Sequence, residues 1–429
     1  RNMAAHHHGL SGWCELLRGR ISQAYFHAER AVNLTVETGA PVPETGSRLF
    51  MAQVLHRKGE EEEASAQLTR IKSLIETFGC QSLQYQLLLT EAQFAMDRGE
   101  EEECMKALRQ ALAYGKSIGL KTMFWIWQPT VMARLCAIAL ENGIEVDYVR
   151  ELIRIFRLPP DDISSGNENW PWSLKLYALG KFELLRDDQP LQFSGKVQKK
   201  PLEMLKALIA FGAKEVSEGQ ITDSLWPDAD GDAAHSAFTT TLSRLRKLIG
   251  NDKAIEIHEG KTTLDPRYCW VDTWTFERMF EQIESEFKRI GEDERDRDAE
   301  EKQIMQLAEK AIAIYRGHFL PTDEGYLWTT SCRERLRTKF FRLITRLGEY
   351  LEKRDRWEKA IEYYQRALDI DDLAEEFYQR LMVCFRQIGQ DGKAVETYRR
   401  CKKTLSAALG IEPSPKTQAI YKTVIGNPR

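Results

Sequence analysis

A repeating pattern of glycines and small apolar residues organises the first part of the chain. Two series of glycines recur 40 residues apart, namely Gly19, Gly59 and Gly99, and Gly39, Gly79 and Gly119. Small and apolar positions recur at the same spacing after each glycine of the first series. Glycine is favoured where a helix ends in a left-handed residue, so the pattern predicts pairs of helices that stack to bury their apolar stripes.

The period, and the turns Lys58-Gly59-Glu60 and Arg98-Gly99-Glu100, resemble tetratricopeptide-type repeats in the longer form found in MalT-like regulators. The resemblance implies that residues 1–157 form a sensor or interaction domain. Two interpretations stay open, a scaffold without a ligand and a surface that docks an effector or a protein partner. The aromatic run Phe124-Trp125-Ile126-Trp127 fits either a groove lining or a core.

The hydrophobic period changes after residue 157. Residues 158–172 are rich in proline, glycine and polar residues, which predicts a linker. Residues 174–184 then alternate apolar and polar positions, followed by a turn at 187–190 and a further strand at 191–193, which predicts a short antiparallel meander. Helical patterns follow at 200–211, 219–226 and 232–249, and a hairpin turning at 259–260 is expected within 255–264.

Strands, three helices and a terminal hairpin are the order of a winged helix. Residues 173–271 resemble the OmpR-type DNA-binding domain, most closely in Leu242-Ser-Arg-Leu-Arg-Lys-Leu248 and in Ile221-Thr-Asp-Ser-Leu-Trp-Pro227. The fold class that we expect is therefore mainly α, with tetratricopeptide-like helical repeats flanking an α+β winged-helix domain.

The third helix of this region carries the candidate DNA contacts. Phe238, Leu242, Leu245 and Ile249 form its buried stripe. The other faces carry Ser236, Thr239, Thr240, Ser243, Arg244, Arg246 and Lys247. Small hydroxyl residues let a helix approach the floor of the major groove, where each base pair presents a distinct pattern of donors and acceptors.

Different basic residues are expected to have different roles. Arg244 is the candidate for a base or phosphate contact, and Arg246 and Lys247 are candidate phosphate anchors. Arg246 has the alternative of a salt bridge within the domain. Lys261, at the tip of the hairpin, suits a minor-groove or phosphate contact. The competing interpretation is a solvated basic helix end, which the helix dipole alone would favour.

Charge counts argue against a strong isolated DNA binder. Residues 173–270 contain 14 basic and 14 acidic side chains, and Asp228, Asp230 and Asp232 precede or begin the third helix, where they would repel phosphates. We therefore expect affinity to depend on dimers or tandem copies, that is, on a homo-oligomer bound to repeated half-sites.

The last third of the chain returns to helical periodicity. Helices are predicted at 273–290, 299–316, 328–353, 356–369, 373–388 and 391–409, with a short one from Lys416. Residues 272–429 resemble the bacterial transcriptional activation domain of the antibiotic regulatory protein family. The residues that carry this match are Tyr315, Gly317, Phe319, Leu320, Tyr398, Leu405, Leu409, Gly410, Pro413 and Pro415.

That resemblance implies a transcriptional activator that binds direct repeats near promoters and recruits RNA polymerase. Many large members of that family carry an upstream nucleotide-hydrolysing switch domain, which the resemblance would place before Arg1. The alternative is a protein-interaction scaffold with a degenerate winged helix that binds no DNA.

Composition narrows the remaining classes. The net charge of −4 and the lack of any run of 18 apolar residues argue against a nucleic-acid-coated or membrane-spanning chain. Eight scattered cysteines, none in a CxxC pair, fit a reduced cytoplasmic protein. Gly260-Lys261-Thr262 ends like a phosphate-binding loop, but Ile255 stands where that motif needs glycine. The tract His6-His7-His8 and the other histidines lack metal-ligand spacing, so we expect no enzyme activity, cofactor or metal.

Overall fold

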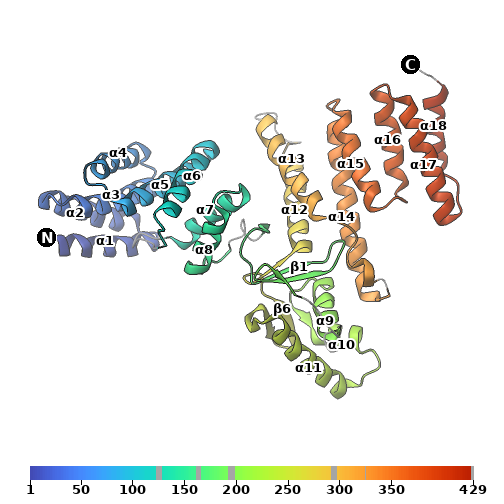
Figure 1. The fold of residues 1–429 in the computed structure, drawn as a ribbon, viewed down its shortest axis with the longest axis horizontal. Helices are drawn as coiled ribbons and strands as arrows, with labels where there is room; N and C mark the ends of the chain where they lie inside the picture. The colour runs from blue at the N-terminus through green and yellow to red at the C-terminus, as the bar shows by residue number, and fades with distance from the viewer. Residues whose placement is uncertain (122–127, 161–165, 192–198, 291–296, 324, 427–429) are drawn as a thin grey trace. The chain divides into compact units, whose positions relative to one another are not determined.

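The computed structural model describes all residues except 122–127, 161–165, 192–198, 291–296, 324 and 427–429 (Figure 1). The chain forms two compact units, Arg1–Pro171 and Trp172–Arg429. Helices dominate both, which confirms the mainly α fold class. The aromatic run at 124–127 lies outside the described residues. The assignment of separate domains at 1–157, 173–271 and 272–429, with a linker at 158–172, stays a prediction.

Paired helices build the N-terminal unit. They are α1 (Asn2–Leu17), α2 (Ile21–Thr38), α3 (Pro41–Lys58), α4 (Glu61–Phe78), α5 (Gln81–Asp97), α6 (Glu101–Ser117), α7 (Pro129–Glu141) and α8 (Val146–Phe156). Each odd-numbered helix packs on the next, and α1, α3, α5 and α7 also pack in succession. The six glycines of the two series all have positive φ angles, between 61° and 87°. Each lies just past a helix, as the spacing predicts.

Small side chains allow the close packing of this unit. Ala24, Ala28 and Ala64 are fully or almost fully buried. Gln53 and Gln93, one repeat apart, exchange two hydrogen bonds of 2.9 and 3.1 Å between their buried amides. Buried amides that satisfy one another fix the register between α3 and α5 without leaving a polar group unpaired.

One histidine also ties neighbouring repeats together. The ring of His56, on α3, stacks on Phe94 of α5 with centroids 4.0 Å apart. Its Nδ1 lies 2.8 Å from a carboxylate oxygen of Glu61 on α4, and its Nε2 lies 3.0 Å from Asp97 on α5. Burial lowers the pKa of His56, but the hydrogen bonds to Asp97 and Glu61 outweigh it and raise the pKa above its ordinary value.

This geometry predicts that His56 stabilises the N-terminal unit more at acidic than at alkaline pH. A raised folded-state pKa means that the contribution is complete below the ordinary histidine pKa and is lost as the pH rises through the folded-state value. We expect calorimetry of the intact chain to show a larger loss of melting temperature for His56→Gln at pH 6 than at pH 8. Replacing the exposed His258 by glutamine is the matched control, and an equal loss at both pH values would contradict the prediction.

The C-terminal unit opens with a winged helix. Its strands are β1 (Leu174–Tyr177), β2 (Glu183–Arg186), β3 (Gln189–Pro190), β4 (Val216–Ser217), β5 (Ile255–His258), β6 (Lys261–Leu264) and β7 (Cys269–Val271). They form two sheets, ordered β3-β2-β1-β7 and β4-β6-β5, in which β1 and β7 are parallel and the other pairs antiparallel. The helices are α9 (Lys199–Ala210), α10 (Glu218–Leu225) and α11 (Gly231–Ile249).

The third strand differs from its prediction. Asp187 and Asp188 adopt positive φ angles of 50° and 64°, so the chain reverses within two residues and β3 begins at Gln189, inside the predicted turn. Leu191 follows the strand, and residues 192–193 lie outside the described residues.

In the part of the chain that the structure describes, seven α-helices follow the winged helix. They are α12 (Asp272–Ile290), α13 (Arg297–Ile314), α14 (Leu327–Glu352), α15 (Trp357–Ile370), α16 (Glu375–Gln387), α17 (Asp391–Leu409) and α18 (Pro415–Gly426). From α14 to α18, each helix packs against the next one in the sequence (Figure 1). One continuous apolar core runs from Leu174 of the winged helix to Val424 of α18.

A clasp of backbone and carboxylate joins the winged helix to these helices. Asp272 accepts hydrogen bonds from the backbone N–H groups of Ala178 and Leu179 at 2.7 and 2.8 Å. Residues 178–180 also bond to residues 318–320, which precede α14. The Gly180 N–H donates to the His318 carbonyl, and the Leu320 N–H donates to the Ala178 carbonyl, each at 2.9 Å. We call residues 178–180, Asp272 and 318–320 the clasp.

The clasp also explains residues of the activation-domain pattern. A Cβ at Gly317 would meet the Cα of Gly180 at 3.0 Å, and Gly180 itself has a φ of 91°, so glycine at both positions favours the close approach of these two segments. Phe319 and Leu320 are fully buried beside it.

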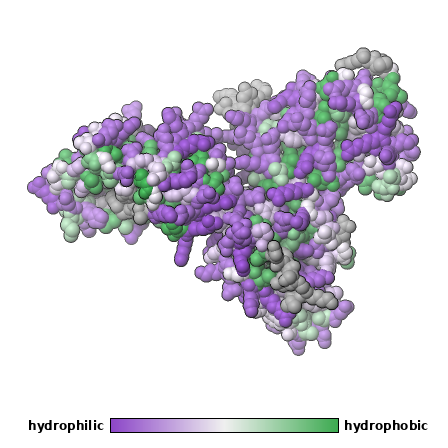
Figure 2. All heavy atoms as spheres, in the orientation of Figure 1, coloured by the Kyte–Doolittle hydropathy of each residue, from purple (hydrophilic) through white to green (hydrophobic). Residues whose placement is uncertain are grey.

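The surface of the chain and the exposure of its cysteines complete the description of the fold. The visible face in Figure 2 is mostly hydrophilic. Among the described helices, none combines the length and apolar composition that crossing a bilayer requires. Six cysteines are buried thiols, whereas Cys14 is exposed and Cys80 is half-buried.

Candidate nucleic-acid interface

Helix α11 presents one buried and one exposed face. Its buried side contributes Phe238, Leu242, Leu245 and Ile249 to the core of the C-terminal unit. The predicted contact residues on the other side are exposed, namely Ser236, Thr239, Thr240, Ser243, Arg244 and Lys247. Within the C-terminal unit, α11 lies at the end away from α15–α18 (Figure 1).

The exposed side chains of α11 differ in how far they are engaged. The Thr239 hydroxyl donates to the carbonyls of His235 and Ser236 at 3.0 and 3.1 Å, which leaves its lone pairs free to accept. Arg244 and Lys247 make no hydrogen bond or ion pair with any residue that the structure describes. Both positive charges therefore lie on the same exposed face of α11.

Arg246 is held inside the domain. It is half-buried, and its Nη2 donates to the backbone carbonyl of Ile255 at 2.8 Å. Of the alternatives foreseen for Arg246, the structure gives an intradomain contact, made with a backbone carbonyl instead of a carboxylate. Its position fixes α11 against the first strand of the hairpin.

The hairpin of β5 and β6 forms the wing. Glu259 and Gly260 make its turn with φ angles of 50° and 72°. Lys261 follows the turn with its side chain 51% exposed, and its Nζ lies 3.8 Å from a carboxylate oxygen of Glu215. A pair this long and exposed is weak, so Lys261 remains available to a phosphate.

A shallow groove of about 760 Å³ separates α11 from the wing. It is lined by Thr239, Leu242, Ser243, Arg246, Lys247, Gly250, Asp252 and Ile257. The groove brings four of the predicted residues together, whereas Lys261 does not line it. The sequence pattern did not single out the lining residues Gly250, Asp252 and Ile257. Ile257 is 43% exposed, although it lies on the same face of β5 as the buried Ile255.

Acidic residues limit this surface at one end. Asp228, Asp230 and Asp232 are exposed before and within the first turn of α11. His235, one turn on, contacts Glu218 of α10 at 2.6 Å. The basic side chains accordingly gather in the C-terminal half of the helix, and this half is where an anionic backbone would be attracted.

Comparisons with known proteins fit the C-terminal unit. Residues 279–425 match the family described as the bacterial transcriptional activator domain. The regulatory protein AfsR of Streptomyces griseus is 24% identical over 254 residues, covering 59% of this chain and 24% of that protein. The transcriptional regulator RedD of Streptomyces coelicolor is 26% identical over 234 residues, covering 51% of this chain and 62% of that protein.

The chain thus spans less than two thirds of the length of either relative. Among solved structures, Mycobacterium tuberculosis EmbR in complex with a low-affinity phosphopeptide is 19% identical with a TM-score of 0.44, over 59% of this chain and 65% of that one. The family match and the two named relatives confirm the predicted resemblance of this chain to transcriptional activators of the antibiotic regulatory protein type.

Proposed function

Because this chain resembles the antibiotic regulatory protein-type transcriptional activators, we propose that it is a sequence-specific DNA-binding regulator that activates transcription from repeated promoter sites. The observation that carries the proposal is the outward face of α11. That face carries hydroxyl side chains next to Arg244 and Lys247, which have no partner among the described residues. A helix of this kind fits the major groove.

Each candidate residue has a distinct role in this proposal. Thr239, Thr240 and Ser243 keep the helix face narrow and offer hydroxyls to bases or phosphates, and Ser236 does so one turn earlier. Arg244 contacts a base edge or a phosphate, and Lys247 anchors a phosphate. Lys261 anchors the wing to the backbone, and Arg246 positions α11 against the wing through Ile255.

The other partners follow from the same family resemblance. We propose that the helices after Asp272 contact RNA polymerase and pair two copies of the chain on DNA. We also propose that the N-terminal repeats receive an effector or a protein partner, and that the protein works in the cytoplasm. The proposal assigns no catalysis and no cofactor to these residues.

One observation favours a second candidate function. The 14 basic and 14 acidic side chains of residues 173–270 favour a scaffold whose winged helix binds no DNA. Affinity at rising salt concentration separates the two functions, because a DNA binder releases counterions.

We expect the intact chain to bind duplex DNA from upstream of its own gene with a steep salt dependence. If Arg244, Lys247 and Lys261 each meet a phosphate, log K against log salt should have a slope of about −3 per bound copy. Electrophoretic or fluorescence titrations at two or more salt concentrations measure this slope. A slope near zero, or no binding at low salt, would support the scaffold instead.

A further inference from the structure

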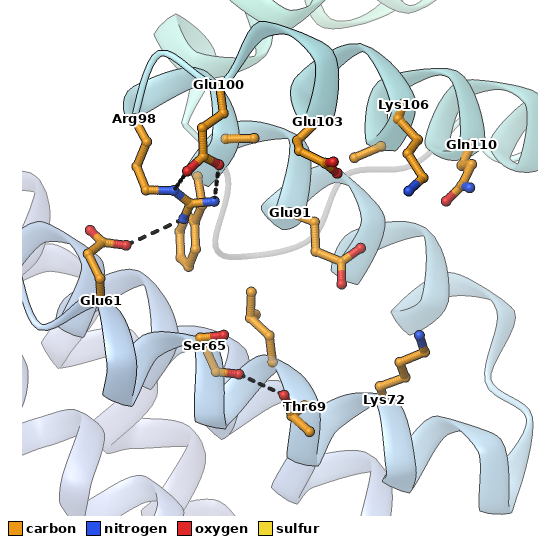
Figure 3. Close-up of a pocket in the computed structure, with 14 residues that line it drawn as sticks. Glu61, Ser65, Thr69, Lys72, Glu91, Arg98, Glu100, Glu103, Lys106 and Gln110 are labelled. Carbon is orange, nitrogen blue, oxygen red and sulfur yellow. Dashed lines mark hydrogen bonds and ion pairs between the residues drawn. The ribbon is translucent and has the colours of Figure 1, made fainter.

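A second surface of the chain carries charged side chains that have no partner among the described residues. It is a groove of about 630 Å³ between α4 and α6, with α5 as its floor (Figure 3). Its size lies within the range of about 300–1,000 Å³ that is usual for small-ligand sites. Leu68, Phe94, Ala95 and Ala107 contribute the apolar part of the lining.

One end of the groove is closed by charges that satisfy one another. Arg98 donates to both carboxylate oxygens of Glu100, at 2.9 and 2.6 Å, and its Nη1 lies 3.5 Å from Glu61. A bidentate arginine of this kind is fixed in place. It defines the end of the site and offers little to a ligand.

The centre of the groove is different. Glu91 points into it from α5, between Lys72 of α4 and Lys106 of α6 (Figure 3). Neither the carboxylate of Glu91 nor the two ammonium groups make a hydrogen bond or ion pair with any described residue. Burial raises the pKa of Glu91 above its ordinary value, and the charge of Lys72 opposes this only in part. A carboxylate that loses water without gaining a donor costs folding free energy.

From this arrangement we propose that the groove binds a short zwitterionic peptide with an apolar side chain. Glu91 accepts the ammonium group of the ligand, Lys72 and Lys106 bind its carboxylate, and Leu68 and Phe94 contact its apolar side chain. The three parts of the ligand thus match the three kinds of side chain in the groove. The proposal concerns the N-terminal unit alone and holds whether or not the winged helix binds DNA.

The test is a calorimetric titration of the intact chain with leucyl-leucine and two blocked forms of it. We expect saturable binding of the free dipeptide, at least about tenfold weaker binding after N-acetylation, and a similar loss after C-terminal amidation, because each change removes one charged contact. Absence of saturable binding by all three peptides at millimolar concentrations overturns the proposal. Equal affinity for the three forms also overturns it.

Variants separate a binding role of Glu91 from a structural one. Glu91→Gln should weaken binding of the free dipeptide at least about tenfold, because it removes a charged contact. The same change should raise the melting temperature of the ligand-free chain at pH 7, because it removes a desolvated charge. That gain should vanish as the pH falls below the ordinary pKa of glutamate, where Glu91 is protonated in both states. Glu62→Gln, an exposed change on α4 outside the groove, should alter neither measurement. A Glu91→Gln variant that binds unchanged, or that melts lower, contradicts the assignment.

Discussion

Replacing Arg244 and Lys247 together by alanine is expected to weaken binding of duplex DNA by about 10- to 100-fold at moderate salt. Both side chains are exposed on the same face of α11, and neither has a partner among the described residues. Their loss removes two attractive contacts without leaving another protein charge unpaired. The slope of log K against log salt should become shallower by about 2 if both meet phosphates.

The structure offers a control with the same change of charge. Arg57 and Arg109 are exposed on α3 and α6 of the N-terminal unit, to which the proposal gives no part in DNA binding, and Arg57→Ala with Arg109→Ala also removes two positive charges. This variant should bind DNA almost as the native chain does. If both double variants lose affinity equally, long-range charge attracts the DNA and α11 is not the reading helix. If neither loses affinity, the site assignment is wrong.

Asp272→Ala is expected to destabilise the C-terminal unit by about 2–5 kcal/mol. The substitution leaves the N–H groups of Ala178 and Leu179 without their acceptor, and both residues are at most 1% exposed. A buried donor left unpaired costs about 1–3 kcal/mol. Chemical denaturation of the intact chain, followed by a probe in the C-terminal unit, measures the loss.

Asp272→Asn tests the charge of this residue separately. Burial raises the pKa of Asp272 to about 7, against the opposing effect of the backbone donors Leu179, Ala178 and Thr273. Stability from this group is therefore greatest below the ordinary aspartate pKa, and it is lost as the pH rises through about 7. The asparagine variant keeps an acceptor oxygen and should lack this pH dependence.

A control for both variants is the exposed Asp369→Ala on α15, expected to change stability by no more than about 0.5 kcal/mol. If Asp272→Ala is as mild as this control, the clasp does not depend on the carboxylate.

The periodicity of the sequence was sufficient to predict most helices of the C-terminal unit. The predicted ranges from 200–211 to 391–409 agree with the observed helices within two residues at each end. Turn residues explain this accuracy, since Gly250 and Gly410 both adopt positive φ angles directly after α11 and α17. The exposure of Arg244 and Lys247 likewise follows from their angular position opposite Phe238 and Leu242.

The local sequence pattern does not predict contacts between residues that lie far apart in the chain. The hydrogen bond from Arg246 depends on where the wing places the Ile255 carbonyl, which no local pattern encodes. His56 and Asp97 are 41 residues apart, and their contact depends on the exact rise between repeats. The pattern of α5 likewise gives no sign that Glu91 finds no hydrogen-bond donor among the described residues.

The clasp has a consequence for the orientation of α11. One apolar core, and hydrogen bonds on both sides of residues 178–180, join the winged helix to the helices beyond it, so we expect α11 to move together with α12–α18. If two copies pair on DNA as proposed, the distance between their α11 helices is set by the surface of α12–α18 that they share. A different spacing of the two bound DNA sites would then require a change in that shared surface, and a fragment cut at residue 271 would lose part of its core together with α12–α18.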